Sequence, residues 1–279
     1  MIILFSALIF AAVLVILNSV VFSVREVRAD CYNLSAKDPE TEQLADKVIE
    51  ASNIKLYKNI ITLNEKKAAK NINAKMDSEV KVINIERKFP NTVWIHFVKL
   101  VPVLAIETND GSFITCDNNL MIIETGKSGN DLRFNSTVEE LEKDRNGAVV
   151  RVRLSGNAVN PAKSKTAVLS NPDAFSALRT VVDTVNRLSY EEYDFVRLLS
   201  EIDMTDFSRA AAPVIKLEMR ESKNRKITFK IQSPQKRLLE KVQHSISAYE
   251  QYVKDKLTFK DMEWTVATNS KNEIMVYAN

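Results

Sequence analysis

Apolar and polar residues alternate most clearly between Val80 and Ile106, and this alternation predicts β-strands. In the second half of the stretch Val93, Ile95 and Phe97 fall on one side of an extended chain, which is the period-two pattern of a strand. In the first half the apolar residues occupy even-numbered positions up to Val82 and odd-numbered positions from Ile83. Phe89-Pro90-Asn91-Thr92 separates the two halves, because proline fixes its own φ and keeps the preceding residue extended. The stretch therefore predicts a β-hairpin, followed without a loop by a strand at Val101–Ile106.

Helical spacing dominates the chain before this hairpin. Between Pro39 and Ser52 apolar residues recur every three or four positions, and acidic residues stand in the first turn, where the helix dipole favours them. Asn64 is a capping residue for a second helix that runs to Met76. A first strand is expected at Val24–Tyr32. The order is then strand, helix, helix, strand, strand.

Short strands with turn signals follow Ile106, and two helices interrupt them. Asn171-Pro172-Asp173 starts a helix whose apolar face requires burial against a sheet, and Pro234 starts the last helix. The remaining strands are predicted at Ser112–Cys116, Leu120–Glu124, Val149–Leu154, Leu199–Met204, Val214–Arg220, Lys226–Ile231, Glu263–Ala267 and Ile274–Ala278. Residues 125–148 are predicted to be irregular, with one helical turn. The predicted fold class is α+β, and this part is a mainly antiparallel β domain with two packed helices.

The N-terminal stretch Ile2–Phe22 contains no charged residue, and its length suits a transmembrane helix. A cleaved signal peptide is the alternative, but it requires a basic start, a shorter apolar core and small residues before the cut. We therefore expect an uncleaved anchor over residues 1–23.

The junction after the hairpin resembles that of the bacterial cell-division proteins FtsQ and DivIB. The shared features are a strand, an arginine, Phe89-Pro90-Asn91-Thr92, a second strand and then Pro102-Val103-Leu104-Ala105. Lys99-Leu100 stands where members of that family usually carry an acidic-basic pair. The resemblance implies a POTRA domain (strand, helix, helix, strand, strand) at residues 24–100 and an FtsQ/DivIB-like β domain at residues 101–279.

The resemblance also implies an orientation in the membrane. Arg25 and Arg28 follow the apolar stretch, which by the positive-inside rule would place the large domain in the cytoplasm. The family instead implies a single-pass protein of the inner (plasma) membrane whose bulk is extracytoplasmic. On that basis a short basic cytoplasmic tail is expected upstream of Met1.

Composition and motifs give little support for chemistry. The 39 basic and 36 acidic residues are mixed along the chain, which does not favour a nucleic-acid partner, and the five glycines form no phosphate-binding motif. Cys31 and Cys116 lack metal-site spacing; they are either free thiols or a pair. His96 and His244 are expected to be structural or surface residues, and Asp203 with Asp206 to be turn residues. We expect no catalytic residue, metal, cofactor or small-molecule substrate; the alternative is a cell-envelope hydrolase with an unrecognised active site.

The function implied by the resemblance is that of a scaffold in the division machinery. In FtsQ and DivIB the C-terminal sheet accepts a strand of a partner protein at its edge. The matching stretch is Glu263–Ala278, and the residues expected to bind a partner are Trp264, Val266, Ile274, Val276 and Tyr277. For Trp264 and Tyr277 the alternative is that both cover the core. The implied partners are FtsB-like (DivIC) and FtsL-like membrane proteins.

Overall fold

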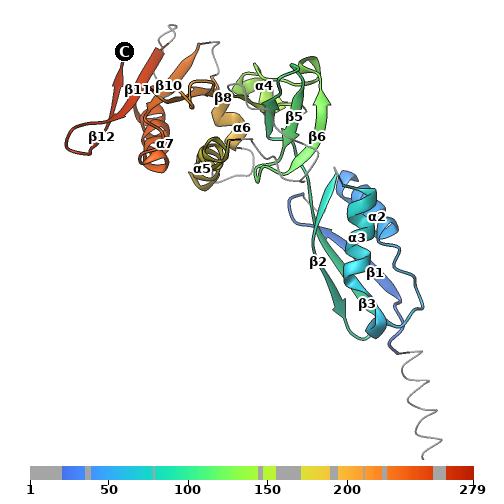
Figure 1. Ribbon diagram of the computed structural model, residues 1–279. Coiled ribbons are helices and arrows are strands. Elements are labelled where there is room, and N and C mark those ends of the chain that lie inside the picture. The colour runs from blue at the N-terminus through green and yellow to red at the C-terminus, as the bar shows by residue number, and fades with distance from the viewer. Residues whose placement is uncertain are drawn as a thin grey trace, which may run out of the picture. The chain divides into compact units, whose positions relative to one another are not determined.

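The computed structural model describes residues 21–34, 39–77, 79–143, 147–154, 171–188, 194–209, 211–221, 225–253 and 262–279. The chain divides into two compact units, unit 1 up to Leu100 and unit 2 from Val101 (Figure 1). None of the helices in the described ranges is both long and apolar enough to cross a membrane. The predicted anchor over residues 1–23 lies outside those ranges except for its last three residues.

Unit 1 has a three-stranded sheet in the order β1-β3-β2, with β1 parallel and β2 antiparallel to the central strand. Its two helices pack against each other and against the sheet. The elements are β1 (Glu26–Cys31), α2 (Pro39–Ser52), a 3-10 turn (Ile60–Thr62), α3 (Glu65–Lys75), β2 (Val80–Lys88) and β3 (Thr92–Lys99). This order confirms the predicted POTRA topology.

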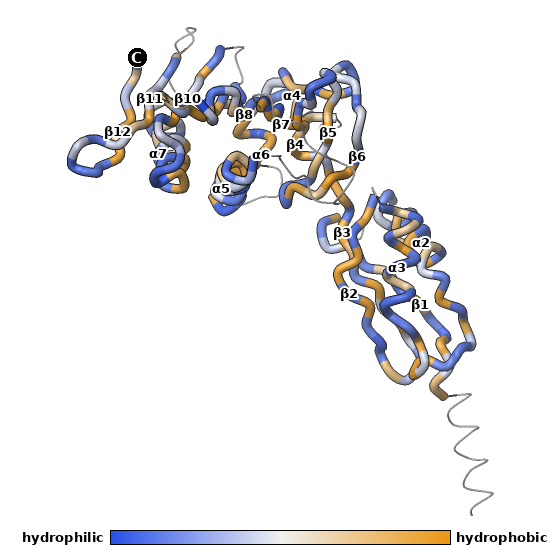
Figure 2. The backbone as a smooth tube through the Cα atoms, viewed as in Figure 1, coloured by the Kyte–Doolittle hydropathy of each residue, from blue (hydrophilic) through white to orange (hydrophobic). Residues whose placement is uncertain are grey.

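The sequence signals of unit 1 correspond to physical contacts. The Asn64 side chain accepts a hydrogen bond from the Lys67 N–H (2.9 Å) and so begins α3. On β3 the predicted inner residues Val93, Ile95 and Phe97 are fully buried. The change of parity after Val82 is a β-bulge between Val82 and Asn84. β2 contains both hydrophobic and hydrophilic residues (Figure 2).

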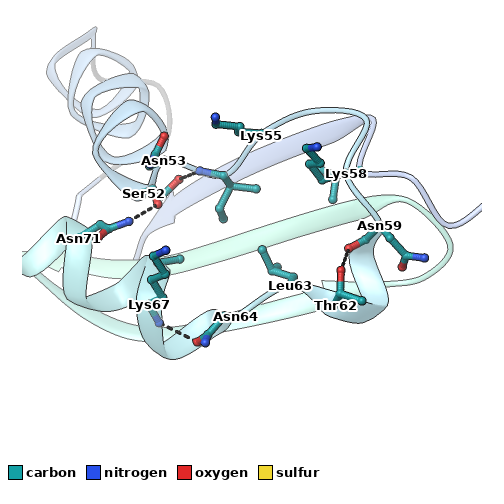
Figure 3. Close-up of a pocket in the computed structure, with 13 residues that line it drawn as sticks. Ser52, Asn53, Lys55, Lys58, Asn59, Thr62, Leu63, Asn64, Lys67 and Asn71 are labelled. Atoms are coloured by element: carbon teal, nitrogen blue, oxygen red, sulfur yellow. Dashed lines mark hydrogen bonds between the residues drawn. The ribbon is translucent and has the colours of Figure 1, made fainter. Parts of the chain in front are cut away.

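A hollow of about 420 Å³ opens where α2 ends and α3 begins (Figure 3). Lys55, Lys58 and Lys67 line it together with Val24. The Ser52 hydroxyl fixes its wall by accepting the Ile54 N–H at 3.1 Å. The hollow is therefore basic, with both polar and apolar side chains in its wall.

Unit 2 is built on one nine-stranded sheet in the order β12-β11-β10-β9-β8-β7-β4-β5-β6. Its strands are β4 (Leu104–Glu107), β5 (Phe113–Cys116), β6 (Ile122–Lys127), β7 (Val150–Leu154), β8 (Leu199–Met204), β9 (Val214–Met219), β10 (Ile227–Gln232), β11 (Met262–Thr268) and β12 (Ile274–Ala278). Its helices are a 3-10 turn (Gly129–Asp131), α4 (Val138–Lys143), α5 (Pro172–Leu188), α6 (Asp194–Leu198), α7 (Leu238–Ala248) and a π turn (Tyr249–Val253).

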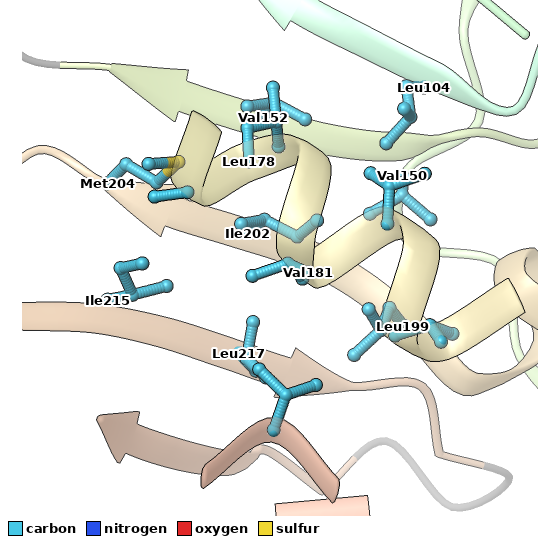
Figure 4. Close-up of a cluster of buried hydrophobic side chains, with 14 of the residues drawn as sticks. Leu104, Val150, Val152, Leu178, Val181, Leu199, Ile202, Met204, Ile215 and Leu217 are labelled. Atoms are coloured by element: carbon cyan, nitrogen blue, oxygen red, sulfur yellow. The ribbon is translucent and has the colours of Figure 1, made fainter. Parts of the chain in front are cut away.

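Two helices, α5 and α7, pack against each other and contribute to one hydrophobic core with the sheet. Leu178 and Val181 of α5 point toward sheet residues such as Val152 and Ile202 (Figure 4). All four side chains are fully buried. The predicted apolar face of α5 is therefore confirmed, except that Leu188 at its end is exposed.

The sheet is mainly antiparallel, as predicted, but it also contains three parallel pairings. β7 runs parallel to both β4 and β8, and β10 runs parallel to β11. Each pair is separated in the chain by a long connection that contains other elements, which parallel pairing requires. Pairing between β8 and β9, β9 and β10, and β11 and β12 is antiparallel, as the short connections predict.

Two predicted boundaries were wrong, and one helix was not predicted. The strand expected at Val101–Ile106 begins at Leu104. The helix expected from Pro234 begins at Leu238, because Ser233 and Arg237 have left-handed φ values of 47° and 55° and make a turn. The helical turn predicted within residues 125–148 is α4, whereas α6 was not predicted.

Both cysteines are free and buried. Cys31 lies in the core of unit 1 and Cys116 in the core of unit 2. Burial, and then the charge of Asp117, raise the pKa of Cys116 to about 12. Cys116 therefore remains a protonated core residue at neutral pH.

Candidate functional site

The strand β12 forms one edge of the nine-stranded sheet. It pairs with β11 from Thr268↔Ile274 to Trp264↔Ala278, and within the described residues it has no neighbour on its other side. An edge strand carries backbone N–H and C=O groups that another strand can pair with. β12 is therefore the candidate site.

The hydrogen bonds at the two ends of the hairpin determine which backbone groups are free. The Asn269 N–H donates to the Glu273 carbonyl (2.9 Å), and the Asn279 N–H donates to the Glu263 carbonyl (3.0 Å). Residues of an antiparallel ladder alternate between bonded and non-bonded pairs, so odd-numbered residues of β12 face β11. The N–H and C=O groups of Ile274, Val276 and Ala278 consequently point outward.

Asparagines hold both ends of the edge strand. In the turn, the Asn269 side chain accepts hydrogen bonds from the Lys271 and Glu273 N–H groups, both at 2.9 Å. At the chain end the Asn279 side chain accepts from the Thr265 hydroxyl (2.8 Å) and donates to Glu263 (2.7 Å). These bonds fix the register of β12, so its outward groups are preorganised.

The side chains of the hairpin divide between two faces. Ile274 and Val276 lie half-buried against the core, as does Trp264 on β11, while Val266 is fully buried. On the other face Tyr277 is 44% exposed. Val266 is therefore part of the core on which β12 packs, whereas the Tyr277 side chain is accessible to a partner.

The sequence reasoning missed Met275, which is 48% exposed on the same face as Tyr277. The alternation of the strand could have indicated Met275, because residues 275 and 277 lie on one face and Ile274 and Val276 lie on the other. Trp264 has a further property: its indole N–H has no hydrogen-bond acceptor among the described residues, although its ring lies 6.2 Å from that of Phe229.

The opposite edge of the same sheet is much less regular. The pairing of β5 with β6 shifts register around Thr115, and Gly126 within β6 has a φ of 73°. Bulges of this kind disrupt the ladder and disfavour pairing with a further strand. Of the two edges, β12 is the one suited to accept a strand.

The residues weighed for chemistry lie at structural or surface positions. His96 lies between the carboxylates of Asp30 (3.8 Å) and Glu86 (3.7 Å), and its ring stacks on Tyr32. His244 is exposed on α7. No group of three or more potential metal-ligating side chains occurs in the described part of the chain.

The carboxylate of Asp203 closes a turn. Its burial opposes ionisation, but hydrogen bonds from Thr205 and the charges of Lys216 and Arg153 outweigh it and lower the pKa. Asp206 faces the same lysine at 3.9 Å. A carboxylate that is held ionised in this way is a poor proton acceptor. The hydrolase alternative gains no support from these residues.

Comparison with known proteins agrees with the fold of unit 1. Residues 43–98 match the family model of the POTRA domain, FtsQ-type. No curated protein matches the chain. The matched segment runs from α2 through β3, which is where the helices and the hairpin of the domain lie. The chain thus carries an FtsQ-type POTRA domain, in the part of the sequence where the junction residues indicated one.

Proposed function

We propose that this protein is a non-enzymatic, single-pass membrane scaffold of the bacterial division machinery. Its FtsQ-type POTRA domain supports a role in cell division, and the uncharged stretch Ile2–Phe22 supports a membrane anchor. In this proposal residues 101–279 form the FtsQ/DivIB-like β domain, and the bulk of the chain is extracytoplasmic.

Partner recruitment takes place by strand addition at β12. The observation that carries this proposal is the regular edge with the outward N–H and C=O groups of Ile274, Val276 and Ala278. A partner strand gains affinity from main-chain hydrogen bonds and selectivity from side-chain contacts. Tyr277 and Met275 provide those contacts on one face, since exposed aromatic and methionine side chains suit interfaces. The proposed partners are FtsB-like (DivIC) and FtsL-like membrane proteins.

The test is the substitution Val276→Pro in the full chain. Proline removes the outward N–H of residue 276 but none of the hydrogen bonds to β11, because Val276 belongs to a non-bonded pair. Val276→Thr is the matched control, since threonine is also β-branched and keeps the N–H. Affinity for the FtsB-like partner is measured by titration in detergent or nanodiscs.

Val276→Pro is expected to weaken binding by roughly tenfold or more, because a lost main-chain hydrogen bond and the ring in the interface both oppose pairing. Val276→Thr is expected to bind within about threefold of wild type. If the proline variant and wild type bind with equal affinity while both chains are folded, the proposal of strand addition at this edge is wrong.

A further inference from the structure

Exposed apolar side chains gather at one end of unit 1. Across the described residues the exposed large hydrophobic side chains number eleven, and five of them stand on three segments: residues 21–25, 54–61 and 87–91. We call these segments the apolar tip. Its exposed members are Val21, Leu56, Tyr57, Ile61 and Phe89. The clustering needs an explanation, since single exposed hydrophobics are ordinary but contiguous ones indicate a contact surface.

Hydrogen bonds join the three segments into one surface. Val24 exchanges backbone hydrogen bonds with the 54–61 segment, donating to the Lys58 carbonyl (2.8 Å) and accepting from the Tyr57 N–H (2.7 Å). The Arg25 N–H donates to the Asn91 carbonyl (2.8 Å), and the rings of Phe22 and Phe89 lie 6.2 Å apart. The three segments of the tip are therefore held together as an ordered part of the domain.

The backbone of Tyr57 is strained. Its φ is 62°, in the left-handed region that bulky residues avoid, and its side chain is 79% exposed. Glycine or asparagine would adopt this turn at lower cost. A tyrosine held outward at such a position points to a contact that the isolated fold does not contain.

The charge of the tip has one sign. Its three segments contain five basic residues, Arg25, Lys55, Lys58, Arg87 and Lys88, and no acidic residue. Arg87 is used internally, where its guanidinium donates to the Ile61 and Leu63 carbonyls (both 2.9 Å), and Lys88 pairs with Glu86 at 2.7 Å. Arg25, Lys55 and Lys58 are exposed and make no ion pair within the described residues. Two of them line the basic hollow of Figure 3.

The position of the tip in the chain indicates what covers it. The apolar stretch ends at Phe22, and the tip already includes Val24. Two extended residues span at most about 7 Å, so no linker separates the tip from the end of a membrane-spanning stretch. Tyrosine and phenylalanine suit the membrane interface, and lysine and arginine suit the phosphates of anionic lipids.

We infer that the apolar tip docks on the membrane surface, with Leu56, Tyr57, Ile61 and Phe89 in the interface and Arg25, Lys55 and Lys58 at anionic lipid phosphates. The contact fixes unit 1 against the bilayer instead of leaving it free to swing on its anchor. The inference rests on the membrane anchoring proposed above, and it is independent of strand addition at β12.

The test uses Tyr57→Trp in the full chain, reconstituted in vesicles of phosphatidylcholine and phosphatidylglycerol with brominated acyl chains. Bromine quenches only tryptophan side chains that lie near the acyl chains. The quenching of Trp94 and Trp264 is measured in the wild-type chain and subtracted from that of each variant. Tyr32→Trp is the matched control, because Tyr32 is an exposed tyrosine (59%) of the same unit beyond the far end of β1. Quenching at residue 57 is expected to exceed quenching at residue 32 at least twofold.

A second pair of variants tests the charges. On the Tyr57→Trp background, Lys55→Gln with Lys58→Gln is expected to abolish the extra quenching that phosphatidylglycerol gives over phosphatidylcholine alone. Lys66→Gln with Lys70→Gln, on exposed positions of α3, is expected to preserve it.

Equal quenching at residues 57 and 32, in a chain that floats with the vesicles, would overturn the inference and leave the anchoring intact. A chain that fails to float would overturn both. Loss of the phosphatidylglycerol effect in both pairs of lysine variants would overturn the assignment of Lys55 and Lys58.

Discussion

Arg220 provides a stringent test of how unit 2 is held together. Its side chain is almost fully buried, and it donates hydrogen bonds to the carbonyls of Val196 (2.6 Å), Phe134 (2.9 Å), Ser136 (2.6 Å) and Val149 (3.2 Å). Burial, and then the charge of Arg133, lower its pKa to about 10, so the guanidinium is still charged at neutral pH. One planar group thus joins three separate segments of the chain.

Arg220→Lys preserves the charge but replaces the planar fork by a single ammonium group. A lysine can reach only some of these carbonyls, so two or more of them lose their donor. Each unsatisfied buried acceptor costs about 1–3 kcal/mol, and a poorly paired buried charge adds to this. We expect the free energy of unfolding of unit 2 to fall by about 3–5 kcal/mol.

Urea unfolding monitored by tryptophan fluorescence resolves the two units, because Trp94 lies in unit 1 and Trp264 in unit 2. With an m-value of about 2 kcal/mol/M, the Trp264 transition of Arg220→Lys should move down by roughly 1.5–2.5 M. The Trp94 transition should not move. Arg209→Lys is the control, since Arg209 is exposed and its contact to Asp206 is 4.0 Å long. A shift of the Trp264 transition below about 0.5 M would refute the structural role of Arg220.

Three further predictions concern single sites. Because burial and the charge of Asp117 raise the pKa of Cys116 to about 12, iodoacetamide at pH 8 should label Cys116 only after unfolding, and rapid labelling of the native chain would contradict its burial. Hydrogen bonds from Thr108 and Ser112 lower the pKa of Asp110 from 3.8 to about 2, so its stabilisation is present above about pH 4 and is lost toward pH 2. The stability difference between wild type and Asp110→Asn should therefore shrink between pH 6 and pH 3; a difference independent of pH would disprove this. Tyr57→Asn should stabilise unit 1 by roughly 1 kcal/mol in urea unfolding, and destabilisation would show that the left-handed φ is not a strain.

The sequence was most informative where the structure depends on local contacts. The cap at Asn64 and the period-two pattern of Val93, Ile95 and Phe97 predict their elements because each residue acts on neighbours in the chain. The bulge after Val82 was visible as a change of parity.

The parallel pairs of unit 2 could not be predicted in the same way. Whether β7 lies beside β4 depends on pairing between residues such as Leu104 and Val150, which are far apart in sequence. The pattern of apolar residues in a strand is the same in either direction, so it does not indicate which strands pair in parallel. The turn ahead of α7 was missed because Arg237 adopts a left-handed φ that its residue type does not signal.

The candidate sites show the same division. The sequence placed the candidate residues on the last two strands, but only the structure shows that Val266 is buried and that the even-numbered backbone groups of β12 point outward. The apolar tip was not anticipated, because Leu56 and Phe89 come together only through the hydrogen bonds of the segment around Val24.

Residue-resolved amide hydrogen exchange of β12, measured by NMR on the full chain with and without an FtsB-like partner, tests the central claim most directly. Strand addition should slow exchange of the Ile274, Val276 and Ala278 amides and leave Met275 and Tyr277 nearly unchanged, because the latter two already pair with β11. Unchanged exchange at the three even-numbered residues in a saturated complex would contradict the account.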